Sequence, residues 1–315
     1  MMRSLPRAVK GLVMRLNKRL FLWPLLRHPG RVEPLSAEEI RRAVLPALAE
    51  DIGSGDVTTL ATVPESAQAQ AVARAREPLV VAGLALAEAT FRELSPAVQV
   101  TCAAQDGQRL TEGKPLLHVA GPARALLSAE RVALNFLQRL AGIATLTAQF
   151  VDAVEGTRAQ ILDTRKTTPG WRKLEKYAVA CGGGRNHRLG LFDMVLIKDN
   201  HLVLLRNESP NAIAAAVQHA RTAHPEHKVE VEADTLEQVE QAVAAGADMI
   251  LLDNMNLVQL RLAVQKCKDR ALTEASGGVT LAGVRAIAET GVDFISVGAL
   301  THSARAVDIG LDFEL

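Results

Sequence analysis

The 315-residue sequence contains few aromatic side chains and almost no excess of charge. Aromatic residues make up 3% of it, and the formal net charge at pH 7 is +1. Proteins that bind nucleic acids neutralise phosphates with a basic surface and stack bases on aromatic rings. We therefore expect no nucleic acid among the partners of this chain.

Cysteine is also scarce, with three in the chain. Cys102, Cys181 and Cys267 lie far apart and have no metal-ligand spacing, so we predict reduced thiols in a cytoplasmic protein. Cys181 lies beside three glycines, where it is either a reactive thiol or, as we favour, a small core residue.

The first 33 residues form a basic extension. Residues 1–32 contain eight Arg or Lys and no acidic residue. We expect no transmembrane segment, because no apolar run is long enough, and we find no clear small-residue cleavage site. An organellar presequence is one interpretation. Pro6, Gly11 and Pro24 favour a surface helix or an extension without a role in the fold, because they interrupt any long amphipathic helix.

Residues 34–145 predict a mixed unit of helices and strands. Ser36 and Glu39 form a capping box, so we expect a helix from there to about Ala49, which Pro46 should kink or end early. The remaining patterns predict a strand at 69–81 broken by Pro78, a helix at 84–94, short strands within 98–119 and a helix from Ala123 to about Gly142.

Between residues 146 and 300, strand-like apolar runs alternate with helical ones. A core of Ala, Val, Leu and Ile suits parallel strands buried between helices, and repeated strand–helix units predict a closed or nearly closed barrel. Six strands are fewer than the eight of a full barrel, so we predict an open one. The predicted strands are 159–162, 194–197, 229–231, 249–252, 271–275 and 294–297, and the predicted helices are 172–180, 211–223, 236–245, 257–268 and 281–290.

Each of the six predicted strands is followed by a charged, hydroxyl or glycine residue. In a parallel barrel all these strand ends lie on one rim, which is where such folds hold their active sites. The first two strands also bound a basic stretch, residues 163–201, with eight Arg or Lys against four acids. The stretch predicts a site for a compact polyanion.

The residues at the rim suggest different roles. Ser276, Gly277 and Gly278 precede a helix predicted from Thr280, so their backbone amides could hold a phosphate, and Gly298 could complete that site. The carboxylates of Glu232 and Asp253 would hold Mg²⁺, stabilise a developing cation, or equally form salt bridges to a neighbouring Lys.

The cationic residues predict a substrate that carries both phosphate and carboxylate groups. Arg131, Arg165 and Arg188 offer planar forks for carboxylates, with Lys166 and His187 as neighbours. A helical Arg131 that follows Glu130 is equally typical of a solvated face. Lys198 is suited to a Schiff base or, as we favour, to a purely electrostatic role.

Eight motifs resemble the quinolinate phosphoribosyltransferase family. Six of them are TRKTTPGWR (164–172), GGGRNHRLGLFD (182–193), KDNH (198–201), VEVEA (229–233), LLDN (251–254) and EASGG (274–278). EDIGSGDVTT (50–59) and ERVALNFLQRLAGIAT (130–145) resemble the family's N-terminal domain, so the resemblance covers residues 34–315 and leaves the extension outside.

The resemblance implies an α/β fold with an N-terminal α/β-sandwich domain (34–145), an open α/β barrel with parallel strands (146–300) and a segment (301–315) that returns to the first domain. The implied reaction transfers phosphoribose from phosphoribosyl pyrophosphate to quinolinate, giving nicotinate mononucleotide, pyrophosphate and CO₂. Mg²⁺ is the implied cofactor, with no prosthetic group. The implied assembly is a homodimer or higher oligomer with a shared active site, which Arg131 of one subunit would reach in its partner.

The implied site residues follow from the matching motifs. The catalytic group comprises Lys166, Lys198, Glu232 and Asp253, of which the two acids face the ribose and the metal. The substrate-binding group comprises Arg131, Thr164, Arg165, His187, Arg188, Ser276, Gly277, Gly278 and Gly298.

Two other functions share parts of this pattern. A paralogue associated with molybdate transport has the same fold, but we expect it to depart from the segments 186–188 and 198–201, which are intact here. A different phosphate-handling barrel, such as an aldolase with a Schiff base at Lys198, is the second alternative.

Overall fold

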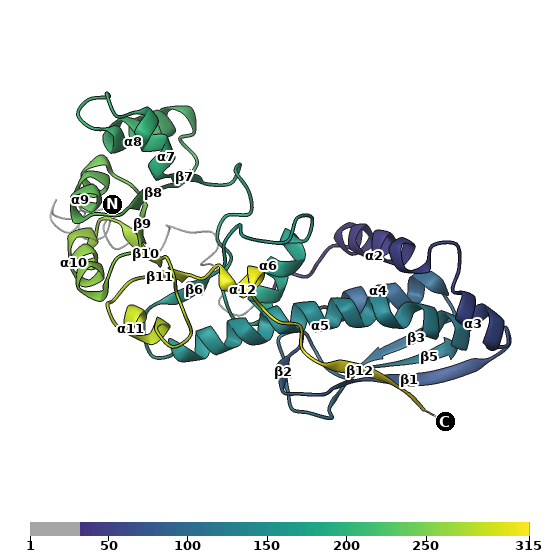
Figure 1. The fold of residues 1–315 in the computed structure, drawn as a ribbon. Coiled ribbons are helices and arrows are strands. Elements are labelled where there is room, and N and C mark those ends of the chain that lie inside the picture. The colour runs from purple at the N-terminus through teal and green to yellow at the C-terminus, as the bar shows by residue number, and fades with distance from the viewer. Residues whose placement is uncertain (1–31, 315) are drawn as a thin grey trace, which may run out of the picture. The chain divides into compact units, whose positions relative to one another are not determined.

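The computed structural model describes residues 32–314, and the predictions for the basic extension lie outside this range. The described chain forms two compact units (Figure 1). The sandwich unit comprises residues 32–155, 161–187 and 298–314, and the barrel unit comprises residues 156–160 and 188–297. Among the described residues, no helix is long and apolar enough to cross a membrane.

An antiparallel sheet is the centre of the sandwich unit. Its strand order is β12-β1-β5-β3, so the last strand of the chain lies beside the first. A second, two-stranded sheet pairs β2 with β4, and β4 lies between Gly107 and Gly113, both of which have positive φ. The strands are β1 (Gln68–Ala75), β2 (Leu79–Val80), β3 (Gln99–Cys102), β4 (Arg109–Leu110), β5 (Pro115–Pro122) and β12 (Ile309–Glu314).

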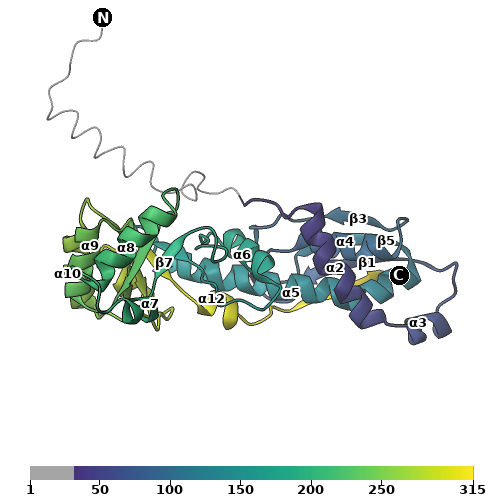
Figure 2. The same cartoon turned by 90° about the horizontal axis from the view of Figure 1, so that it is seen from above.

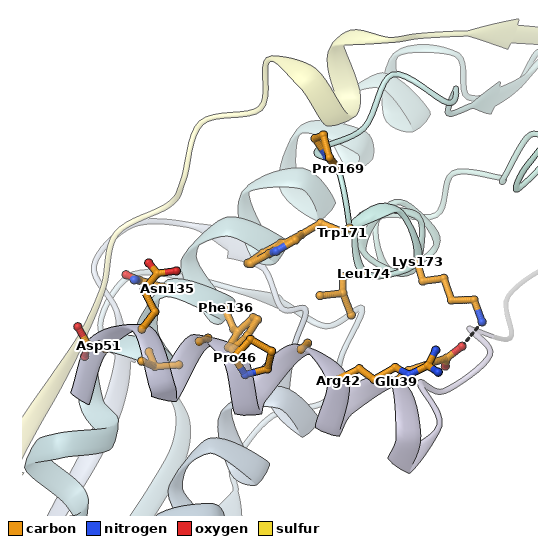
Figure 3. Close-up of a pocket in the computed structure, with 15 residues that line it drawn as sticks. Glu39, Arg42, Pro46, Asp51, Asn135, Phe136, Pro169, Trp171, Lys173 and Leu174 are labelled. Atoms are coloured by element: carbon orange, nitrogen blue, oxygen red, sulfur yellow. Dashed lines mark hydrogen bonds and ion pairs between the residues drawn. The ribbon is translucent and has the colours of Figure 1, made fainter. Parts of the chain in front are cut away.

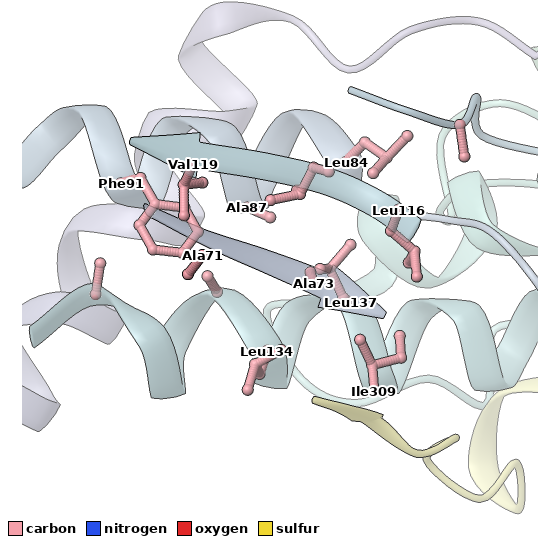
Figure 4. Packing of buried hydrophobic residues seen from close by; sticks show 14 of the residues in the cluster. Ala71, Ala73, Leu84, Ala87, Phe91, Leu116, Val119, Leu134, Leu137 and Ile309 are labelled. Atoms are coloured by element: carbon pink, nitrogen blue, oxygen red, sulfur yellow. The ribbon is translucent and has the colours of Figure 1, made fainter. Parts of the chain in front are cut away.

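Two helices, α4 (Leu84–Leu94) and α5 (Ala123–Ala153), cover this sheet and share its hydrophobic core. Val119 of β5, Phe91 of α4 and Leu137 of α5 belong to one buried cluster (Figure 4). Fully burying such a side chain contributes roughly 1.5–3 kcal/mol, so the core stabilises this unit. The other helices of the sandwich unit are α2 (Ala37–Ile52), α3 (Val57–Thr62), α6 (Arg172–Cys181) and α12 (Ala299–His302).

Two helix boundaries differ from the sequence prediction. The capping box at Ser36 and Glu39 is present, but α2 continues through Pro46 to Ile52. Helix α5 continues eleven residues past Gly142 to Ala153. A Cβ at position 142 would lie 2.0 Å from the carbonyl oxygen of Arg305, so this glycine permits a close backbone approach and does not end the helix.

A further sheet consists of parallel strands in the order β6-β11-β10-β9-β8-β7, of which β7 to β11 belong to the barrel unit. All six strands predicted for it are present, and β6 and β7 are the two edges, which confirms an open α/β sheet. The strands are β6 (Gln160–Leu162), β7 (Val195–Ile197), β8 (Val229–Ala233), β9 (Met249–Asp253), β10 (Leu272–Ser276) and β11 (Phe294–Ser296).

Helices follow the strands of the barrel unit in the predicted alternation, and one short helix, α7 (Asp199–Leu204), was not predicted. In Figure 2 α8, α9 and α10 lie next to one another, and contacts join α8 to α9 and α9 to α10. Gly246 ends α9 with φ 79°, the left-handed conformation typical of a C-cap glycine. The helices are α7 (Asp199–Leu204), α8 (Ala212–Ala223), α9 (Leu236–Ala245), α10 (Leu257–Cys267) and α11 (Val284–Ala288).

A partly buried carboxylate fixes the start of the C-terminal strand in the sandwich unit. One oxygen of Glu77 accepts hydrogen bonds of 2.8 Å from Arg305 Nη1 and from the amide of Asp308, and its other oxygen pairs with Arg305 Nη2. The bonds from Arg305 and Asp308 lower the pKa of Glu77 to about 2. Because Asp308 directly precedes β12, these contacts hold that strand in register with β1.

We expect Glu77→Gln to lower the free energy of unfolding by about 1 kcal/mol at neutral pH. Charge-assisted contacts that solvent can reach contribute little to stability. The pKa of Glu77 is depressed by folding from its ordinary 4.5, so its contribution is complete above that pH and disappears as pH falls through about 2. Urea unfolding across this range should show the two proteins converging in acid, with the exposed Glu65→Gln as control. A difference that does not change with pH would contradict this.

Candidate active site

One face of the parallel sheet in the barrel unit is polar although the sheet is buried. Strand side chains alternate between the two faces, and on β8 Val229, Val231 and Ala233 alternate with Glu230 and Glu232. All five are buried. Helices α8 and α9 pack on this strand, so the apolar set faces the helices and the two glutamates face the other side.

The strand register extends this polar face to neighbouring strands. Glu232 is paired with Leu251, two residues before Asp253, and Asp253 is paired with Ser276. On the other side, Leu196 is paired with Glu230, which places Lys198 level with Glu232. The polar face therefore carries Lys198, Glu230, Glu232, Asp253, Glu274 and Ser276.

Lys198 and Glu232 form an ion pair on the polar face. The Glu232 side chain is 10% exposed and the Lys198 side chain 44% exposed, so the cation keeps access to solvent. The salt bridge to a neighbouring lysine, one of the roles predicted for Glu232, is present. The following turn is fixed by His201, whose Nδ1 accepts the amide of Lys198 at 2.9 Å.

Asp253 and Ser276 end adjacent strands, and the residues after them are closely packed. Asn254 donates its side-chain amide to Asp253 Oδ2 at 2.7 Å and its backbone amide to the Ser276 carbonyl at 3.0 Å. A Cβ on Gly277 would lie 2.1 Å from Asn254 Oδ1, so only glycine leaves room for this asparagine. Gly278 has φ 56° and open space around its Cβ position.

The helix after these glycines begins later than the sequence predicted. Helix α11 begins at Val284 instead of Thr280 and has five residues, because Gly283 and Val284 first bond back to Thr280 in a turn. Ser276, Gly277 and Gly278 therefore form a turn at the strand end and do not directly precede a helix N-terminus.

In the sandwich unit, Lys166 packs over Gly298. A Cβ on Gly298 would lie 3.1 Å from Lys166 Cδ and 3.1 Å from His302 Nε2. Thr164 Oγ1 accepts the amide of Lys166 at 3.1 Å, and the Thr301 hydroxyl donates to its carbonyl at 2.7 Å. The structure thus brings together Thr164, Lys166 and Gly298, three of the predicted site residues.

His302, an exposed residue four positions after Gly298, was not among the predicted site residues. The available signal was the helical spacing that returns a side chain to the glycine one turn earlier.

A buried carboxylate holds the loop that follows Arg165. Glu175 is 0% exposed and accepts the amide and hydroxyl of Thr168 at 3.1 Å and 2.8 Å. Arg139 of α5 donates to the same carboxylate at 3.1 Å. Contacts from α5 and α6 therefore fix this loop, which restricts where the predicted substrate-binding residue Arg165 can lie.

The remaining predicted residues differ in exposure. Arg131 is exposed on α5, whereas His187 and Arg188 are each 7% exposed. Arg188 donates to the carbonyl of Met194 at 3.2 Å. Cys181 is buried, and burial raises the pKa of its thiol to about 12, so the structure favours the core role over the reactive one.

The sandwich unit also contains a cavity of about 580 Å³ between α2, α5 and residues 169–174 (Figure 3). Trp171 stacks on Phe136 along its wall, with 5.3 Å between ring centroids. Lys173 and Glu39 form an ion pair at one edge. Its lining, as far as the described residues extend, includes none of the predicted site residues, and nothing in the sequence pattern pointed to it.

Both parts of the chain match family models. Residues 56–141 match the N-terminal domain of quinolinate phosphoribosyl transferase, and residues 143–312 match its C-terminal domain.

Proteins with similar sequences align with this chain over most of their own length. A nicotinate-nucleotide pyrophosphorylase [carboxylating] of Mycobacterium leprae is 47% identical over 278 residues, which span 86% of this chain and 96% of that protein. A probable enzyme of the same name from Bacillus subtilis is 44% identical over 268 residues, 84% of this chain and 90% of that protein.

Solved structures agree with these relatives. The nicotinate-nucleotide pyrophosphorylase of Francisella tularensis superposes with a TM-score of 0.85 at 37% identity, covering 91% of this chain and all of that one. NadC of Streptococcus pyogenes gives the same TM-score at 39% identity, covering 90% of this chain and 100% of that one.

We expect Gly277→Ala to lower the free energy of unfolding by roughly 2–4 kcal/mol and Gly278→Ala by about 1 kcal/mol. Both place a side chain at positive φ, but only the first forces its Cβ into Asn254. Urea unfolding of the two variants measures the difference. Equal losses would mean that Asn254 moves aside freely.

Proposed function

The chain belongs to the quinolinate phosphoribosyltransferase family, and on that premise we propose how its residues carry out the reaction. It catalyses the formation of nicotinate mononucleotide from quinolinate and phosphoribosyl pyrophosphate, with release of pyrophosphate and CO₂, a step of NAD biosynthesis. The observation that carries the residue assignments is the polar face, on which a lysine and several carboxylates meet at the carboxyl ends of parallel strands.

The cationic side chains bind the dianionic pyridine substrate in this proposal. Arg165, Arg188 and His187 hold the two carboxylates of quinolinate, because guanidinium forks bind carboxylates in a bidentate manner. Arg131 does so from a partner subunit, and its exposure on α5 supports this role. We propose a homodimer or higher oligomer on this basis.

The phosphate groups of the second substrate meet a different set of residues. Ser276, Gly277 and Gly278 at the end of β10 offer amides and a hydroxyl, and Thr164 and Gly298 flank Lys166. Lys166 and Lys198 neutralise charge on the departing pyrophosphate, since point charges suit phosphate oxygens.

The acidic residues act on the cation that forms when the bond from C1′ to pyrophosphate breaks. Glu232 and Asp253 stabilise the resulting oxocarbenium-like ribose, and the pyridine nitrogen then bonds to C1′. The positively charged ring accepts the electron pair when the bond to the 2-carboxylate breaks and CO₂ leaves, after which the ring carbon takes a proton. Positive and negative residues are therefore both needed at one site.

Mg²⁺ fits the acids of the polar face. Glu232 uses Oε2 for the pair with Lys198 and Asp253 uses Oδ2 for Asn254, and the second oxygen of each carboxylate is a donor that suits a hard cation. When bound, Mg²⁺ would neutralise charge on the pyrophosphate.

The ion pair of Lys198 also argues against a Schiff-base enzyme, because an ammonium group held by a carboxylate is not a nucleophile.

We further propose that residues 34–145 and 146–300 are the functional domains and that residues 301–315 belong to the first. The pairing of β12 with β1 supports this division. We propose a cytoplasmic enzyme, which the three free cysteines support.

One assay tests the proposed chemistry. The purified protein is incubated with quinolinate, phosphoribosyl pyrophosphate and Mg²⁺, and CO₂ and nicotinate mononucleotide are measured. Chelation with EDTA should stop turnover, and added Mg²⁺ should restore it. Absence of product, or equal turnover of nicotinate, would refute the proposal.

We expect Arg165→Ala to raise KM for quinolinate at least ten-fold while the melting temperature changes by no more than about 2 °C, because a half-exposed residue that binds substrate contributes little to folding. Steady-state kinetics and thermal unfolding on the same preparation separate the two effects. A loss of stability as large as the loss of binding would assign Arg165 a structural role.

A further inference from the structure

The carboxylate of Asp163 lies where three segments of the sandwich unit meet. Asp163 is 0% exposed and directly follows β6, one residue before the segment Thr164 to Lys166. Its amide donates to the carbonyl of Arg185 at 3.0 Å, and Leu162 forms a parallel bridge with Arg185. The segment from Arg185 to His187 therefore runs alongside the end of this strand.

Three donors converge on this carboxylate. Its Oδ1 pairs with the ammonium group of Lys176 from α6 and accepts the amide of His187 at 2.8 Å. Its Oδ2 accepts from the side chain of Asn186 at 2.7 Å, in the amide orientation that also lets Asn186 donate to the Lys176 carbonyl at 3.0 Å. A single buried group thus connects a strand end, a helix and the segment that carries His187.

Lys176 binds the other backbone polar group of His187. Its ammonium group also donates to the carbonyl of His187 at 2.9 Å, and its own side chain is 3% exposed. Both backbone polar groups of His187 are therefore bound by the pair, the amide by Asp163 and the carbonyl by Lys176. We call Asp163 and Lys176 the clamp.

An ion pair so deeply buried is poor as a pure stabiliser. Removing two charges from water costs several kcal/mol for each ion, and matched apolar replacements are often no less stable. Consistent with this cost, burial raises the pKa of Asp163 to about 6 despite the opposing effects of Lys176 and of the His187 amide. What the pair supplies beyond stability is a fixed geometry.

We propose that Asp163 and Lys176 are positioning residues that hold His187, and the segment beginning at Thr164, where they bind the carboxylates of quinolinate. This inference rests on the proposed function of His187 and Arg165. Neither clamp residue contacts substrate in it, since both are enclosed by protein. The clamp acts through the backbone of the residues that do.

The consequence is an effect on substrate capture that is separable from folding. Asp163→Asn alone or Lys176→Met alone leaves one buried group without its partner, so either single change should destabilise the protein. The double variant, Asp163→Asn with Lys176→Met, removes both charges and keeps their volume. It should regain most of the stability, but it lacks the ammonium group that binds the His187 carbonyl, and the His187 amide meets a neutral side-chain oxygen in place of a charged one.

The experiment measures KM and kcat for quinolinate, with thermal unfolding, in four proteins: the full-length chain, the double variant, His187→Ala, and the triple combination. We expect the double variant to unfold within about 5 °C of the parent and to raise KM at least ten-fold with kcat changed less than three-fold. His187→Ala should raise KM at least ten-fold in the parent but less than three-fold in the double variant. Such non-additivity is what residues acting through one another produce.

A matched control is the pair Arg221 and Asp248 of the barrel unit. Arg221 donates to Asp248 at 2.6 Å, and the same carboxylate accepts the amide of Val229 at 2.9 Å, so it also combines an ion pair with a backbone bond. Arg221→Met with Asp248→Asn should leave KM within two-fold.

Two outcomes would overturn the inference. One is a folded double variant with the KM of the parent, and the other is an additive effect of His187→Ala in both backgrounds. In either case turnover by the parent and by the control would still stand as evidence for the proposed function.

Discussion

The two-residue periodicity of the parallel strands is the constraint on which the active site depends. In β8 it sends Val229, Val231 and Ala233 toward the helices and Glu230 and Glu232 to the opposite face. A shift of one residue would bury carboxylates against apolar helices and expose the core. Because the same register continues through β9 and β10, the packing that forms the sheet also brings Asp253 and Ser276 side by side.

Buried carboxylates on this face have a cost that limits where they occur. A charge removed from water without compensation costs several kcal/mol, so each acid needs a nearby partner. Lys198 fills that requirement for Glu232, and Asn254 does so for Asp253. Residues assigned to chemistry are therefore also residues that the fold must neutralise, and this is why a salt bridge and a catalytic role were equally consistent with the sequence.

Local patterns were enough to predict the six barrel strands, the capping box at Ser36 and the strand-end residues, because each follows from neighbours within about ten residues. Several of the features that failed or were missed depend on distant partners. Gly142 looked like a helix end until Arg305, far along the chain, was found against it. His302 and the bonds of Lys176 to Asp163 and His187 likewise depend on where separate elements pack, which periodicity does not encode.

The two lysine–carboxylate pairs of this protein illustrate how exposure decides what an ion pair can do. Lys176 is 3% exposed and Lys198 is 44% exposed, although each contacts an acid at the end of a parallel strand. An enclosed ammonium group cannot exchange its partner for a ligand, because water and substrate do not reach it. A half-exposed one can leave its carboxylate when a phosphate arrives, and the carboxylate it releases is then free to face a cation. In the roles we propose, the same chemical pair thus serves geometry in one unit and electrostatics in the other.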